Sequence, residues 1–143
     1  MKKALIQIFI ITSLLVSFSG HTANLNNVSK AIVKLYVTQQ AWDMVQPWTK
    51  KSIGKQVCTG FFVKEGILTN AHCVADATYI EMEIPRLSEK VEATIVSVNH
   101  QVDLALLKPK DPDFKADVSP IKFGDLPDSR EKVVTIGYPQ GGR

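Results

Sequence analysis

Two cysteines and a histidine are the side chains of this sequence whose types and spacing could do chemistry. Cys58 and Cys73 are the chain's two cysteines, and His72 directly precedes the second of them. Imidazole exchanges protons near neutral pH, so His72 is a candidate general base. Asp103 lies further along the chain, and a carboxylate bound to one imidazole nitrogen fixes the tautomer that a general base requires. His72 and Asp103 therefore predict acid–base chemistry if the fold brings them together.

A β-hairpin must position the histidine and the cysteines. The residues of Gln56–Val63 favour a strand, Lys64–Gly66 a turn, and Ile67–Thr69 a return strand. The return strand leads into the histidine, which places it where a rigid scaffold can hold a reactive side chain. The hairpin also brings Cys58 and Cys73 near each other, which is compatible with a disulfide in an oxidising compartment.

Asp103 stands directly before a short apolar run, Leu104–Leu107, which is typical of a buried strand. Aspartate is disfavoured inside strands, so at this boundary it needs solvent or a hydrogen-bond partner, and a histidine would satisfy it. A zinc site is the alternative for the same part of the chain, with Cys58, His72, Cys73 and His100 as ligands. We do not favour metal binding, because there is no Cys-x-x-Cys spacing and neighbouring ligands converge poorly on one ion.

Hydrophobic residues elsewhere recur with a period of two, which predicts an all-β chain built as an antiparallel barrel or sandwich. Short helices are expected only at Asn24–Ser29 and just after Asn70. The further expected strands are Ala31–Val37, Tyr79–Ile84, Val91–Val98 and Val133–Ile136.

One long connection, Thr38–Lys55, lacks any clear period and contains Trp42, Trp48 and the lysines 50, 51 and 55. The tryptophans could pack against another protomer or cover the end of the barrel.

The N-terminal residues have the build of a secretory signal peptide. Lys2 and Lys3 precede an apolar run, Ala4–Val16, which is followed by small and polar residues. The run is short for a membrane anchor, so we expect residues 1–23 to be removed and residues 24–143 to have no stable membrane span. The chain of 143 residues has 17 Lys+Arg against 14 Asp+Glu, an excess too small to indicate nucleic acid as a partner.

Taken together, the motifs resemble those of trypsin-like serine proteases of the Deg/HtrA branch. The segments that carry the resemblance are Gly60–Val63, Thr69–Val74, Asp103–Leu107, Ile121–Pro127 and Val133–Gly142. The resemblance implies two antiparallel β-barrels, of which this chain would hold the first and the start of the second. It also implies His72 as general base, Asp103 as its orienting acid, and a disulfide between Cys58 and Cys73, which many Deg proteins lack.

The resemblance further implies polypeptide substrates, no cofactor and a homo-oligomer, whereas the signal segment implies a periplasmic or secreted location. The expected nucleophile is a serine in a Gly-Asn-Ser-Gly-Gly-like turn, and none of the chain's nine serines has a Gly-x-Ser-x-Gly setting. We therefore expect the N-terminal portion of a serine endopeptidase that is inactive alone. A non-catalytic binding module or pseudoprotease is the alternative.

Overall fold

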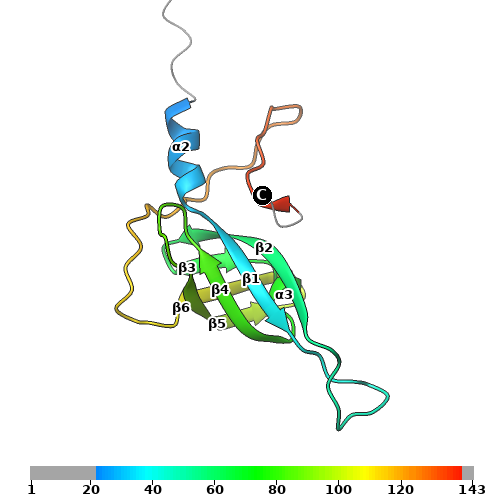
Figure 1. The fold of residues 1–143 in the computed structure, drawn as a ribbon. Coiled ribbons are helices and arrows are strands. Elements are labelled where there is room, and N and C mark those ends of the chain that lie inside the picture. The colour runs from blue at the N-terminus through cyan, green and yellow to red at the C-terminus, as the bar shows by residue number, and fades with distance from the viewer. Residues whose placement is uncertain (1–21, 140–143) are drawn as a thin grey trace, which may run out of the picture.

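The computed structural model describes residues 22–139, and their fold is a closed, six-stranded antiparallel β-barrel (Figure 1). The predicted signal segment therefore lies almost wholly outside the described residues. The strands are hydrogen-bonded in the order β1-β2-β3-β6-β5-β4, with β4 returning to pair with β1. The elements are α2 (Thr22–Lys30), β1 (Ile32–Gln39), β2 (Gly54–Val63), β3 (Gly66–Thr69), α3 (Ala71–Val74), β4 (Ala77–Glu83), β5 (Val91–Asn99) and β6 (Leu104–Pro109).

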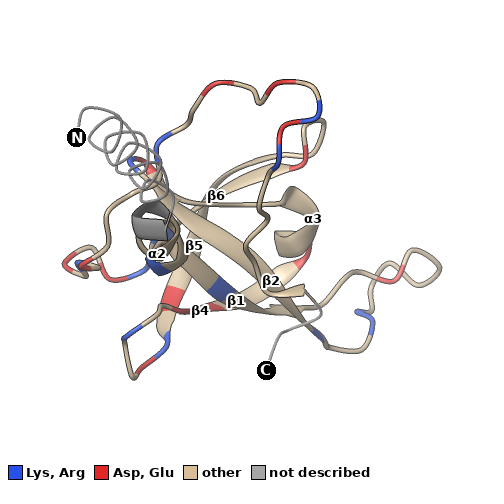
Figure 2. Ribbon diagram, turned by 90° about the horizontal axis from the view of Figure 1, so that it is seen from above, with Lys and Arg blue, Asp and Glu red and all other residues tan. Residues whose placement is uncertain are grey.

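Alternation of side chains along each strand fills the barrel. In β1, Val33, Leu35 and Val37 are buried, whereas the intervening Lys34 and Tyr36 face outward. The other strands contribute inward residues in the same way, chiefly Ile67, Ile80, Met82, Ala93, Ala105 and Leu107. Charged residues lie in the loops and at a few positions of the strands (Figure 2), and none of those that the structure describes is buried. The expected all-β barrel is thus confirmed.

Two glycines are required by this packing. Gly60 faces the barrel interior, where a Cβ atom would lie 2.8 Å from Ile67 Cγ2 and 3.1 Å from Leu35 Cδ1. Gly66, in the turn that joins β2 to β3, has φ of 153°, and a Cβ there would collide with the carbonyl oxygen of Leu107. Both positions keep the hairpin that leads to His72 close to its neighbours.

The described residues after β6, 110–139, run over the barrel without forming a further strand. The amide of Ile121 donates to the carbonyl of Phe62 at 2.8 Å, and the amide of Tyr138 donates to Thr59 Oγ1 at 2.8 Å. The strand expected at Val133–Ile136 is not formed. A strand needs a neighbouring edge to pair with, and a closed barrel offers none.

Candidate active site

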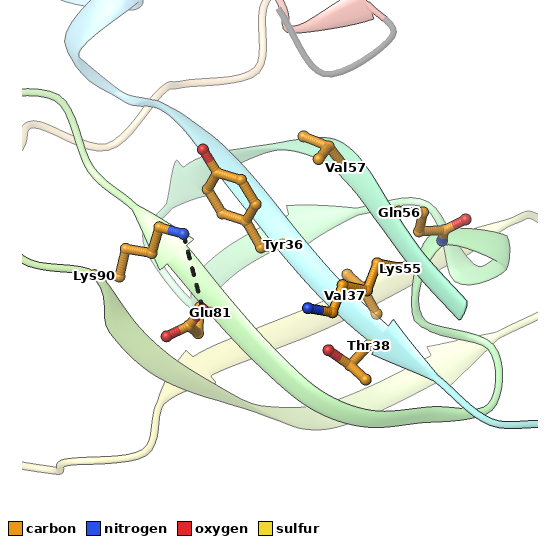
Figure 3. A pocket seen from close by; sticks show the side chains of 8 residues that line it. All are labelled: Tyr36, Val37, Thr38, Lys55, Gln56, Val57, Glu81 and Lys90. Atoms are coloured by element: carbon orange, nitrogen blue, oxygen red, sulfur yellow. Dashed lines mark ion pairs between the residues drawn. The ribbon is translucent and has the colours of Figure 1, made fainter. Parts of the chain in front are cut away.

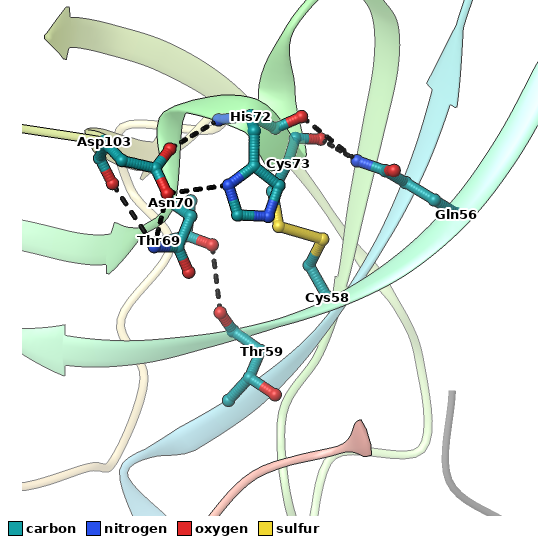
Figure 4. A network of polar contacts seen from close by, with 8 residues as sticks. All are labelled: Gln56, Cys58, Thr59, Thr69, Asn70, His72, Cys73 and Asp103. Carbon is teal, nitrogen blue, oxygen red and sulfur yellow. Dashed lines mark hydrogen bonds and ion pairs between the residues drawn. A yellow bond between two sulfur atoms is a disulfide. The ribbon is translucent and has the colours of Figure 1, made fainter. Parts of the chain in front are cut away.

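His72 and Asp103 meet at one end of the barrel, where β3 and β6 lie side by side. The register of these antiparallel strands pairs Thr69 with Ala105, so the segment after β3 and the residue before β6 are neighbours. His72 Nδ1 lies 2.7 Å from Asp103 Oδ2 (Figure 4). The two residues that sequence spacing proposed as a pair are therefore brought together by the fold.

The carboxylate of Asp103 is held by more than the imidazole. Its Oδ1 accepts the backbone N–H of His72 at 2.9 Å, and its Oδ2 also accepts the amide of Asn70 at 3.0 Å. The backbone N–H of His72, the imidazole and the Asn70 amide all favour the charged form, and together they lower the pKa of Asp103 despite its partial desolvation. The contact between His72 and Asp103 is consequently built around a carboxyl group whose charged form is favoured.

Asp103 adopts a left-handed backbone conformation, with φ of 52°. Aspartate tolerates this region better than most residues, although it remains uncommon. The conformation places the carboxylate against α3 just before the chain enters β6.

The short helix α3 carries His72 and is held by a disulfide and by hydrogen bonds from two glutamine side chains. Cys73 forms a disulfide with Cys58 of β2, as expected from the hairpin. The side-chain amide of Gln56 donates to the carbonyl of Cys73 at 2.6 Å, and that of Gln39 donates to the carbonyl of Ala75 at 2.8 Å. These bonds satisfy backbone carbonyls at the C-terminal end of α3, which would otherwise lack partners.

The supporting residues around α3 were not found from the sequence. Gln39 and Gln56 lie 36 and 17 residues from the carbonyls they bind, and no local pattern marks such contacts. Thr69 is buried, and its hydroxyl donates to the carbonyl of Thr59 at 2.9 Å. Only Asn70 carried a signal, because an asparagine between a strand and a helix often binds neighbouring polar groups.

The candidate pair is open to solvent. The side chain of His72 is 69% exposed and that of Asp103 is 44% exposed. A surface cavity of about 370 Å³ adjoins the imidazole. Its lining includes Gln56 of β2, Asp76 after α3, and Ser52, which lies in the loop between β1 and β2. In the described part of the chain no hydrogen bond links Ser52 to His72.

A second cavity, of about 430 Å³, lies on the outer face of β1, β2 and β4 (Figure 3), and Gln56 lines both it and the cavity beside His72. Lys90 Nζ lies 3.5 Å from the centroid of the Tyr36 ring and 3.9 Å from the carboxylate of Glu81. Lys90 and Glu81, two of the charged residues that line this cavity, are thus partners of each other.

Metal binding by the cysteines is not compatible with the structure, since both sulfurs are used in the disulfide. Among residues 22–139, no group of three or more potential ligands is placed to hold a metal ion. Over the same residues, no helix is long and apolar enough to cross a membrane.

The sequence of this closed barrel, with its histidine–aspartate pair, was compared with models of known protein families. The family model "Trypsin-like peptidase domain" matches residues 58–143, which is more than half of the chain. The chain therefore belongs to the trypsin-like peptidase family, and within it to the Deg/HtrA type, whose members are also called Do-like proteases.

The relatives that support this placement share about a third or more of their aligned residues with the chain. The "Serine protease DegP homolog" of Plasmodium falciparum is 42% identical over 118 residues, which cover 79% of this chain and 13% of the relative. The "Protease Do-like 2, chloroplastic" of Arabidopsis thaliana is 34% identical over 113 residues, covering 78% of this chain and 19% of the relative. The chain thus spans less than a quarter of the length of these relatives.

A solved structure confirms the fold. The structure titled "HtrA-type protease AlgW with tripeptide" aligns with a TM-score of 0.55 at 23% identity, covering 74% of this chain and 30% of that one. The closed antiparallel β-barrel expected of a trypsin-like protease is the fold observed.

Proposed function

We propose that this chain supplies the general base and the orienting acid of a serine endopeptidase that hydrolyses polypeptides. The observation that carries the proposal is the 2.7 Å contact between His72 Nδ1 and Asp103 Oδ2 at the end of a trypsin-like barrel. In this mechanism a serine Oγ attacks the scissile carbonyl while His72 Nε2 takes its proton and later gives it to the leaving amine. Asp103 holds the imidazole in the required tautomer and stabilises the imidazolium.

We further propose that the barrel is inactive without a serine from a second barrel. None of the chain's serines has the setting of a nucleophile, and the pair is exposed to water. Electrostatic interactions are much weaker in water than in a water-excluded site, so a productive dyad needs to be covered. The second barrel would supply the nucleophile, the oxyanion-hole amides and this cover.

A chimera tests the proposal. The chain would be joined after Arg143 to the part of the Plasmodium falciparum relative that follows the matched region, and peptide cleavage would be measured. Asp103→Asn is expected to lower kcat by about 10⁴-fold, and His72→Ala by at least as much. His100→Ala, a second exposed histidine, is the matched control and should leave cleavage unchanged. A His72→Ala chimera that retains full activity would refute the assignment.

The chain alone gives a second test that does not require a chimera. A fluorophosphonate probe reacts only with an activated serine, so the unmodified 143-residue chain should not be labelled. Labelling of the chain that is lost in Ser52→Ala, the serine in the cavity beside His72, would contradict the proposal that the nucleophile comes from a second barrel.

We also propose that residues 1–23 are a secretory signal and that residues 24–143 act outside the cytoplasm, where homo-oligomers can form. The disulfide supports an oxidising compartment, and the organellar locations in the names of the plant relatives agree with placement outside the cytosol. N-terminal sequencing of the exported protein tests the signal. A product that still begins at Met1 would contradict removal of the segment.

A further inference from the structure

The loop between β1 and β2 extends away from the barrel, at the end opposite α2 (Figure 1). We call residues 40–53 the projecting loop. Its large apolar side chains are turned to solvent: Trp42 is 55% exposed, Met44 85%, Val45 86%, Trp48 79% and Ile53 64%. The sequence left open whether the tryptophans cover the end of the barrel, and the structure shows that they do not. Contiguous exposed apolar side chains mark interaction sites.

Hydrogen bonds within the projecting loop hold this arrangement in place. Trp42 and Lys50 form a β-bridge, and the carboxylate of Asp43 accepts the backbone N–H groups of Val45 at 2.8 Å and Gln46 at 3.3 Å. These two amides lower the pKa of Asp43. The other backbone bonds join Asp43 N–H to Thr49 O (3.0 Å), Thr49 N–H to Gln46 O (2.8 Å) and Lys51 N–H to Ala41 O (2.9 Å). The polar groups are thus paired internally while the apolar side chains point outward.

Three lysines lie on the arm of the projecting loop that leads into β2 or at the start of that strand. Lys50, Lys51 and Lys55 are exposed, and Lys50 Nζ lies 4.8 Å from the centroid of the Trp42 ring. The single acidic residue of this stretch, Asp43, is occupied by backbone amides. Exposed apolar side chains next to a group of lysines are complementary to a lipid bilayer with anionic headgroups. Tryptophan favours the interface of such a bilayer, and lysine favours its headgroups.

We propose that the projecting loop docks this protein on the surface of an anionic lipid bilayer. Met44, Val45 and Trp48 would enter the boundary between headgroups and acyl chains, and the three lysines would contact the headgroups. A protein surface could cover the apolar tip, but the lysines favour a surface that is negative throughout. The proposal does not depend on peptidase activity. Because Lys51 and Ser52 line the cavity beside His72, docking would hold that cavity next to the bilayer.

Tryptophan fluorescence provides a specific test, since both tryptophans of the chain lie in the projecting loop. The full chain would be mixed with vesicles of equal parts phosphatidylglycerol and phosphatidylcholine, or of phosphatidylcholine alone. We expect the emission to shift to shorter wavelength, and brominated acyl chains to quench it, with the anionic vesicles only. Emission is preferable to co-sedimentation because the apolar run Ala4–Val16 can itself associate with lipid.

Charge variants separate a docking surface from general attraction. Replacing lysines 50, 51 and 55 by glutamine should weaken binding to anionic vesicles about a hundredfold, since each lysine near such a surface contributes about fivefold. The control replaces the exposed lysines 64, 108 and 115, which lie outside the projecting loop, and should bind as the unmodified chain does. Equal weakening by both sets would overturn the proposal.

Apolar variants test insertion. Met44→Ser combined with Val45→Ser should reduce the shift and the quenching, whereas Phe123→Ser combined with Leu126→Ser, at exposed apolar positions elsewhere, should not. All four positions are exposed, so the fold should be retained, and circular dichroism checks this. Absence of a shift with anionic vesicles would refute the proposal. A shift that depends on protein concentration without vesicles would instead assign the projecting loop to a second copy of the chain.

Discussion

At the scale of single residues, the candidate site depends on how Asp103 is held. Its carboxylate receives the backbone N–H and the imidazole of His72 and the amide of Asn70, while its own backbone is left-handed. An exposed ion pair contributes little to stability, so this arrangement is better explained by orientation of the imidazole than by stabilisation of the fold. His72 and Asp103 could be proposed as a pair because each is next to a predicted strand, His72 after one and Asp103 directly before another, in motifs that resemble those of a known family.

Acidification should weaken the network around Asp103. The pKa of the folded-state carboxyl is lowered, so its contribution to stability is present above the unfolded value of about 3.9 and is lost as pH falls through the folded value. The free energy of unfolding, measured by urea titration, should therefore be larger for the unmodified chain than for Asp103→Asn at about pH 6. This difference should shrink below about pH 4. The pKa of Asp43 is also lowered, but Asp43 is present in both proteins, so its contribution cancels when their free energies of unfolding are subtracted at each pH. A difference independent of pH would contradict this account.

Asn70 should act on the carboxylate rather than on the fold. Asn70→Ala removes the amide that donates to Asp103 Oδ2, so the pKa of Asp103 should rise toward its ordinary value. Titration of the carboxyl carbon by NMR measures this change directly. Asn27→Ala, in α2, is the matched control and should leave the titration of Asp103 unchanged. An unaltered pKa of Asp103 in Asn70→Ala would show that the hydrogen bond from the Asn70 side chain does not influence the carboxylate.

At the scale of elements, the short helix α3 depends on bonds made by distant strands. A helix of four residues is too short to be stable alone. The disulfide and the hydrogen bonds from Gln39 and Gln56 provide the stabilisation that the helix itself lacks. The hairpin and its disulfide could be predicted because the turn and the cysteines are close in sequence. The glutamine contacts could not, since they depend on which strands become neighbours when the barrel closes.

Loss of the disulfide should destabilise the barrel without unfolding the hairpin completely. It closes a loop with a sequence separation of 15, for which the cross-link is worth about 3 kcal/mol in the chain-entropy view. We expect Cys58→Ser combined with Cys73→Ser to lose free energy of unfolding of about this size, measured by urea titration. Addition of a reductant to the unmodified chain should have the same effect and should leave the double variant unaffected. Equal stability of oxidised and reduced chain would contradict the prediction.

At the scale of the whole molecule, closure of the barrel decides what the sequence could and could not predict. Alternation along Ile80, Met82 and their neighbours indicated a half-buried strand, and β4 is formed there. The same reasoning failed at Val133–Ile136, because an apolar run becomes a strand only where an unpaired edge is available, and the closed barrel has none. Val133 and Val134 are accordingly 69% exposed.

Packing of the barrel interior should be sensitive to an added methyl group at one glycine and insensitive at another. Gly60→Ala places a Cβ atom 2.8 Å from Ile67 Cγ2, so overpacking should cost about 1–3 kcal/mol of the free energy of unfolding. Gly54 is in the same strand, and a Cβ atom added there would meet nothing within 4 Å, which makes Gly54→Ala the matched control. Equal stability of the two variants in urea would show that Gly60 is not required by packing.

Closure of the barrel at β6 also has a consequence for the order of events during synthesis. Every strand of the barrel lies between Ile32 and Pro109, so all its ladders can form once residue 109 is available, whatever follows. The contact between His72 and Asp103 could then form on the growing chain before the residues after Pro109 are made. The connection after Pro109 is therefore the earliest place at which the chain can be divided without removing a strand of the barrel.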